Sequence, residues 1–135
     1  MEKKRKILLV DDDPDILSQL ELLLKSHGYE VFTADTSHKA FEIFQKELPD
    51  AVATDLMMEE MDSGFMLTYQ IKKTEHGKKI PVIVLTSATY VTGYKFDAFT
   101  TEEKDWLKCD AVLNKPINVE ELMQKIDSYF PEEQQ

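Results

Sequence analysis

Cysteine is almost absent from this chain of 135 residues, in which Cys109 is the only one. A single cysteine excludes an internal disulfide bond and every metal site that needs several cysteine ligands. The lack of a disulfide framework also suits a reducing compartment, and we expect a cytoplasmic protein.

A long apolar segment is missing from the N-terminus. Basic residues open the sequence, but the apolar run that follows them extends only from Ile7 to Val10. A signal peptide or a transmembrane helix needs a much longer apolar run. We therefore expect neither a membrane span nor a membrane partner.

Basic residues are fewer than acidic residues in this chain. The chain has 16 Lys and Arg residues against 26 Asp and Glu residues, and its formal net charge is -10. An acidic surface argues against nucleic acid as a partner.

The content of 42% hydrophobic and 31% charged residues is ordinary for a globular protein. We predict a single domain over residues 1–135, with its core at about 5–130 and a polar tail at 131–135.

Strand-like and helix-like segments alternate along the chain. Short apolar runs predict strands at residues 7–10, 29–34, 51–55, 81–87 and 111–114. Apolar residues at helical spacing predict five helices. Three of them begin at polar caps, namely Asp13, Thr36 or Ser37, and Asn118. A fourth follows a loop through Gly64, and a short fifth one covers residues 100–107. This repetition predicts an α/β fold, a doubly wound five-stranded parallel sheet of order 2-1-3-4-5, flavodoxin-like, with helices on both faces.

Carboxylates gather where two of these strands end. Asp11 and Asp12 follow the first strand and Asp55 ends the third, and the carboxyl ends of parallel strands line one crevice. Two carboxylates about 4 Å apart repel each other by about 4 kcal/mol at an effective dielectric constant of about 20. A hard cation offsets this repulsion, and Mg²⁺ prefers oxygen ligands. The sequence therefore predicts a Mg²⁺ site at Asp11, Asp12 and Asp55.

Groups suited to a phosphoryl group follow the other two strands of this crevice. Thr86 and Ser87 end the fourth strand, and Lys115 follows the fifth. A lysine and Mg²⁺ balance the charge that develops on phosphoryl oxygens, and an aspartate can form an aspartyl-phosphate. We therefore expect Asp55 to be a nucleophile that faces a hydroxyl group and Lys115.

Four segments in this order resemble the receiver domain of two-component response regulators. They are ILLVDDD (7–13), AVATDLMMEEMDSGF (51–65), PVIVLTS (81–87) and LNKPI (113–117). The resemblance covers nearly the whole chain. It implies that Asp55 is the phosphoacceptor, that a histidine kinase or a histidine phosphotransfer protein donates the phosphoryl group, and that an unknown downstream protein responds.

The resemblance also implies roles for the residues around the phosphoacceptor. Asp12 would contact Mg²⁺ directly, Asp11 mainly through water, and the backbone carbonyl of Met57 would be another ligand. Thr86 matches the switch hydroxyl that moves to meet the phosphoryl group. Lys115 matches the lysine that the family places beside it.

The chain departs from the usual receiver pattern at several positions. Glu59 stands where typical receivers have proline, and residues 62–64 contain one extra residue. Val112 stands where many receivers have a tyrosine or phenylalanine that swings on activation. The stretch 88–108 is longer than usual. We therefore expect this stretch, with the fifth strand and the last helix, to be the mobile part and to face the partner.

Five other residues have structural interpretations. His27, His38 and His76 lack the spacing of metal ligands, so we interpret them as surface residues. Cys109 is interpreted as a small packing residue. Asp13, the third aspartate of its run, is interpreted as a helix cap.

Three functions fit these observations. The first is a stand-alone receiver that signals through a changed protein-binding surface and catalyses only its own phosphorylation and dephosphorylation. The second is a small Mg²⁺-dependent phosphatase of the haloacid dehalogenase type with Asp11 as nucleophile, although Pro14 and Asp15 do not fit that motif. The third is a degenerate receiver that binds a partner without phosphorylation, which Val112 favours and the complete acidic set disfavours.

Overall fold

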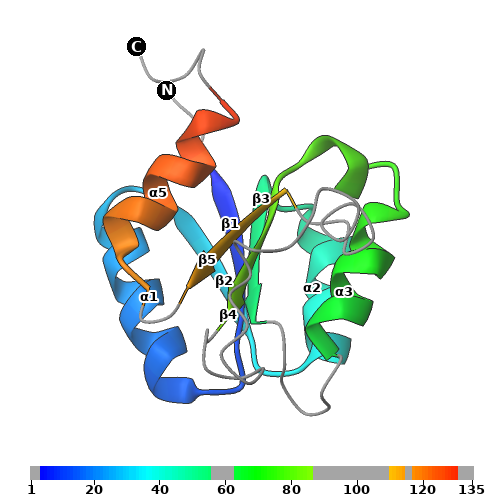
Figure 1. The fold of residues 1–135 in the computed structure, drawn as a ribbon, viewed down its shortest axis with the longest axis horizontal. Coiled ribbons are helices and arrows are strands. Elements are labelled where there is room, and N and C mark those ends of the chain that lie inside the picture. The colour runs from blue at the N-terminus through cyan, green and yellow to red at the C-terminus, as the bar shows by residue number, and fades with distance from the viewer. Residues whose placement is uncertain (1–3, 56–62, 87–109, 115–116, 131–135) are drawn as a thin grey trace.

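Five parallel strands form the centre of the molecule (Figure 1). The structure is a computed structural model, and it describes residues 4–55, 63–86, 110–114 and 117–130. The strands are β1 (Lys6–Val10), β2 (Glu30–Ala34), β3 (Ala51–Asp55), β4 (Val82–Thr86) and β5 (Ala111–Asn114). Their order is β2-β1-β3-β4-β5 and every neighbouring pair is parallel, which confirms the predicted doubly wound sheet.

Helices cover both faces of this sheet. They are α1 (Pro14–Ser26), α2 (Ser37–Glu47), α3 (Ser63–Lys72) and α5 (Val119–Ser128), with a short 3-10 helix η1 (Gly77–Lys79). The first and last of the α-helices lie on one face, and α2 and α3 lie on the other (Figure 1). The helix predicted over residues 100–107 falls outside the described residues. None of the helices in the described part of the chain has both the length and the apolar character that crossing a membrane requires.

Each face of the sheet has its own apolar core. Ile7 and Leu9 of β1 pack with α1 and α5. Leu8 and Val10 of the same strand pack with α2 and α3. Successive side chains of a strand point to opposite faces, so a strand covered on both faces is apolar at consecutive positions. The run at residues 7–10 has this composition because β1 lies between two other strands in the sheet.

Polar side chains begin the helices where the sequence predicts them. Asp13 Oδ1 accepts hydrogen bonds from the backbone N–H groups of Asp15 at 2.9 Å and Ile16 at 3.4 Å. The side chains of Thr36 and Asn118 cap α2 and α5 in the same way. These bonds satisfy N–H groups that have no partner within the helix, which is why the helices begin there.

The predicted start of α3 was wrong. The helix begins at Ser63, so Gly64 lies inside it and not in a preceding loop. The cost of about 1 kcal/mol for glycine relative to alanine applies to a helix interior, and Gly64 is only the second residue of α3. Leu67 and Ile71 of α3 are fully buried, and burial of side chains of this size contributes more than the glycine costs.

The surface interpretation of the histidines was wrong for one of the three. His27 and His38 are exposed, as predicted. His76 is partly buried: its Nε2 lies 2.6 Å from the backbone oxygen of Pro49, and its ring centroid lies 5.8 Å from that of Phe44. The contact joins the segment after α3 to the segment before β3, so no local sequence pattern could show it.

Oppositely charged groups meet at the amino end of the sheet. Lys72 Nζ lies 2.7 Å from Asp110 Oδ2 and donates a hydrogen bond to the backbone oxygen of Ile80 at 2.6 Å. Asp110 Oδ2 also accepts the backbone N–H of Val82 at 2.8 Å. Because Asp110 directly precedes β5, this network joins α3, β4 and β5.

A second group of contacts holds the C-terminal part of the chain to the same end. The Tyr29 hydroxyl donates to Asp127 Oδ1 at 2.9 Å, and the Arg5 guanidinium carbon lies 3.8 Å from the centroid of the Phe130 ring. Burial and the hydrogen bond to Asp127 raise the pKa of Tyr29 to about 12, and the nearby charge of Arg5 opposes this shift.

Candidate functional site

The carboxyl end of the sheet brings the predicted acidic residues together. The register of β1 and β3 pairs Val10 with Thr54, so the next residues, Asp11 and Asp55, leave the two strands side by side. One carboxylate oxygen from each of Asp11, Asp12 and Asp55 lies within 4.8 Å of the other two. The three aspartates that the sequence places at strand ends therefore converge on one point.

The three consecutive aspartates after β1 have three different environments. Asp11 is 1% exposed, and its Oδ1 accepts the backbone N–H of Asp13 at 2.9 Å. Asp12 is exposed, and Asp13 turns back to cap α1. The backbone N–H of Asp11 donates to Ala34 at the end of β2 at 3.2 Å. The tight turn into α1 therefore decides which carboxylates reach the cluster.

Asp55 lies near the centre of the sheet. It is the last residue of β3, between β1 and β4, and it is 7% exposed. The preceding Thr54 is fully buried, and its hydroxyl donates to the backbone oxygen of Asp55 at 3.0 Å. This bond satisfies a polar group inside the core and restrains the end of β3. The sequence analysis missed Thr54, because a threonine within an apolar strand looks like any other β-branched residue.

The donor set of this cluster fits a small, hard metal ion. Carboxylate oxygens are the ligands that Mg²⁺ prefers, and Mg²⁺ keeps several water ligands, so a few protein groups are enough. Asp12 is exposed, which leaves one side of the cluster open to solvent. Asp11 and Asp55 are more than nine-tenths buried, and charges buried to this degree are paired or coordinated to a metal. The cluster can therefore hold a metal ion.

The other predicted site residues are described only in part. Thr86 ends β4, and its backbone pairs with Asn114 at the end of β5. Asp55 pairs with Leu85, so Thr86 leaves β4 one residue beyond the level of Asp55, at the same edge of the sheet. Predictions for Met57, Glu59, Ser87 and Lys115 fall outside the described residues.

The fold and the cluster together define a class of protein, a doubly wound α/β domain with an acidic crevice beyond the carboxyl ends of β1 and β3. A family profile described as the response regulator receiver domain matches residues 7–127. The chain belongs to this receiver family of two-component signalling systems.

Two relatives agree with this membership. The transcriptional regulatory protein GlrR of Escherichia coli K12 is 37% identical over 125 residues, which are 93% of this chain and 26% of GlrR. The protein PilH of Pseudomonas aeruginosa is 30% identical over 126 residues, which are 91% of this chain and 95% of PilH. The chain thus spans about a quarter of one relative and nearly the whole of the other.

A solved structure agrees as well. The chemotaxis response regulator CheY4 of Vibrio cholerae superposes with a TM-score of 0.77 at 27% sequence identity, covering 94% of this chain and 99% of that chain. The likeness supports the strand order and the two helical layers described above.

Proposed function

We propose that Asp55 accepts a phosphoryl group from a histidine kinase or a histidine phosphotransfer protein in a Mg²⁺-dependent reaction, and that the phosphorylated protein signals through a changed protein-binding surface. The observation that carries this proposal is the convergence of three carboxylates within 4.8 Å at the carboxyl end of the sheet. Family membership supports it, because receiver domains take phosphoryl groups from such partners.

The chemistry requires one bond to form and one to break. A carboxylate oxygen of Asp55 bonds to phosphorus while the P–N bond of the donor's phosphohistidine breaks, and the electron pair of that bond stays on the histidine nitrogen. Asp11 and Asp12 would hold a Mg²⁺ ion, whose charge would offset that of the phosphoryl oxygens. Thr86 ends β4, and Lys115 is the next residue in the sequence after β5. We assign to these two residues the remaining phosphoryl oxygens.

Transmission of the signal depends on the strands beside the phosphoacceptor. A phosphoryl group adds about -1.5 to -2 charge at pH 7, with strong acceptor oxygens. Val112 of β5 is partly buried and has no ring that could swing between the core and the surface. We therefore assign transmission to residues 88–108 together with β5 and α5. The net charge of -10 favours a protein as the downstream partner over nucleic acid.

The phosphatase alternative has less support from the site. A phosphatase of the haloacid dehalogenase type would use Asp11 as its nucleophile. Asp11 is 1% exposed, and one of its oxygens already accepts the backbone N–H of Asp13. This burial and this hydrogen bond support our assignment of a structural and metal-holding role to Asp11 and of the nucleophilic role to Asp55.

Measurement of the intact mass after incubation with acetyl phosphate and Mg²⁺ tests the proposal. We expect one added phosphoryl group on the wild type, none on Asp55→Asn, and none when Mg²⁺ is chelated. Asp35→Asn is the matched control, because Asp35 is an exposed aspartate directly after β2. Phosphorylation of Asp55→Asn to the wild-type level would refute the assignment, and turnover of an aryl phosphate that depends on Asp11 would favour the phosphatase.

A further inference from the structure

Strand β2 has an open side. It is the outermost strand at its end of the sheet, and among the described residues only β1 pairs with it. The backbone N–H of Glu30 and the backbone C=O of Ala34 bond toward β1, at 2.9 Å and 3.2 Å. Main-chain groups alternate between the two sides of a strand. Those of Val31 and Thr33 therefore point away from the sheet.

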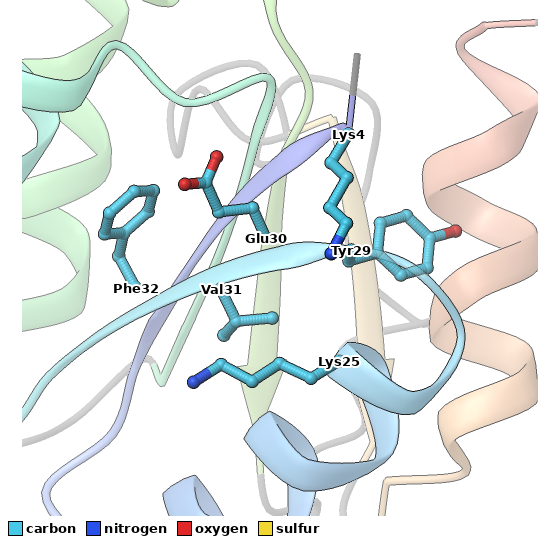
Figure 2. A pocket seen from close by; sticks show the side chains of 6 residues that line it. All are labelled: Lys4, Lys25, Tyr29, Glu30, Val31 and Phe32. Atoms are coloured by element: carbon cyan, nitrogen blue, oxygen red, sulfur yellow. The ribbon is translucent and has the colours of Figure 1, made fainter. Parts of the chain in front are cut away.

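Two grooves follow this open side from one end of β2 to the other. The first has a volume of about 590 Å³ and is lined by Lys4, Lys25, Tyr29, Glu30, Val31 and Phe32 (Figure 2). Glu30 and Val31 project to opposite sides of the strand in this view, with Lys25 of α1 on the side of Val31. The second groove, of about 440 Å³, is lined by Leu17, Thr33, Asp35, Lys39, Glu42 and neighbouring residues.

The two grooves carry opposite net charge. Two lysines and one glutamate line the first groove, which leaves one positive charge. Asp35, Glu42 and Lys39 line the second, which leaves one negative charge. The net charge of the lining residues therefore reverses from one end of β2 to the other, and Glu21, the ion-pair partner of Lys25 at 2.8 Å, lies outside the groove lining.

We propose that β2 pairs antiparallel with β2 of a second copy of this chain, about a two-fold axis beside Phe32. Val31 and Thr33 would then bond to Thr33 and Val31 of the second copy through four main-chain hydrogen bonds. Phe32 would face its own copy at the non-hydrogen-bonded position on the axis. The two sheets would become one continuous sheet.

Complementary charge favours a second copy of this chain, over other extended segments, as the partner that pairs with β2. Antiparallel pairing sets the positive groove of each copy against the negative groove of the other, so opposite charges meet at both ends of the contact. Charged side chains beside an edge strand usually prevent pairing. The two-fold axis turns them into an attraction here, and a two-fold contact closes after two copies, so no fibre forms.

Sedimentation velocity over a concentration series tests this pairing. We expect the wild type to form a dimer, and Thr33→Pro to raise its dissociation constant about tenfold or more, because proline removes an outward N–H from each copy. Thr33→Val keeps that N–H and should dimerise like the wild type. Circular dichroism checks that both variants fold. A wild type that stays monomeric at millimolar concentration overturns the proposal, as does a folded Thr33→Pro that dimerises normally.

A disulfide tests the register without weakening the edge. In a Cys109→Ser background, Phe32→Cys would place two cysteines across the axis, at positions whose Cα atoms lie about 4.5 Å apart in antiparallel sheets. We expect a disulfide-linked dimer after oxidation in air. Glu30→Cys is the control, because residue 30 is more exposed than residue 32 yet would face Ala34 of the second copy. Equal cross-linking of the two variants overturns the proposed register.

Discussion

The two ends of the sheet differ in how their charged groups are arranged: like charges meet at the carboxyl end, and opposite charges meet at the amino end. At the carboxyl end, three aspartates bring like charges within 4.8 Å of one another. At the amino end, Lys72 meets Asp110 at 2.7 Å, and Tyr29 donates a hydrogen bond to Asp127 at 2.9 Å. Like charges at such a distance repel by roughly 3–4 kcal/mol per pair at an effective dielectric constant of about 20. A bound cation would offset this repulsion. The comparison therefore separates an end that can hold a metal ion from an end whose charged groups are already paired.

Chain direction explains why the acidic residues lie at the carboxyl end. Strand β1 leads directly into α1, whose first residue is Pro14. The N-terminus of a helix carries partial positive charge, which favours carboxylates within about the first turn. Helices end at the opposite edge, where their first N–H groups are absent. Repulsion at the carboxyl end is thus partly relieved by the fold before any metal binds.

The largest expected effect concerns metal binding at Asp12. A ligand at about 100 times its dissociation constant stabilises the folded state by about 2.7 kcal/mol. Asp12→Ala should lose most of the increase in melting temperature that Mg²⁺ produces, and without metal it should melt slightly above the wild type because one like charge is gone. Asp15→Ala, at an exposed site in the first turn of α1, is the control. Equal Mg²⁺ shifts in Asp12→Ala and wild type would exclude Asp12 as a ligand.

A second substitution removes the charged network at the amino end of the sheet. Asp110→Ala leaves the side chain of Lys72, which is 15% exposed, without its carboxylate, and it removes the acceptor of the Val82 N–H. We expect a loss of about 2 kcal/mol in urea denaturation, with the Mg²⁺ response unchanged. Asp35→Ala removes an exposed pair with Lys39 and should change stability by less than about 1 kcal/mol. Equal stability of the two variants would show that the Lys72 network does not stabilise the fold.

A third substitution distinguishes the capping role of Asp13 from the proposed metal-holding role of the two aspartates before it. Asp13→Ala removes the cap of α1 and should lower stability by about 1 kcal/mol. Its Mg²⁺ response should match the wild type, because the bond from residue 13 to Asp11 comes from the backbone N–H, which alanine keeps. Titration with Mg²⁺ followed by thermal melting measures both quantities. A weakened Mg²⁺ response would place Asp13 among the groups that hold the metal.

The effect that is smallest at neutral pH is a dependence of stability on high pH. The pKa of Tyr29 is raised from 10.0 to about 12 in the folded protein. The neutral phenol is therefore favoured by folding, so its contribution is complete below about pH 10 and is lost as the pH rises toward about 12. Tyr29→Phe should flatten stability over this interval, whereas Tyr69→Phe, at a 45% exposed residue, should not. Urea denaturation at several pH values would contradict this if wild type and Tyr29→Phe kept the same slope.

Local patterns in the sequence predicted most of the secondary structure. The strands at residues 7–10, 51–55 and 111–114 and the caps Asp13 and Asn118 depend on side chains within a few positions of one another. Such information is present in the order of residues, because apolar periodicity and capping are short-range effects. The start of α3 was misjudged because Gly64 is a weak local signal, and the burial of the same helix outweighs it.

The sequence by itself determined that Asp11 and Asp12 follow one strand and that Asp55 ends another, and the carboxyl ends of parallel strands share one edge of the sheet. Only the tertiary structure decided which of those carboxylates is buried, that Lys72 meets Asp110, and that Tyr29 reaches a residue 98 positions away. The physical reason is that periodicity reports which face of an element is apolar. The register between strands and the packing of helices decide which distant polar groups come within bonding distance.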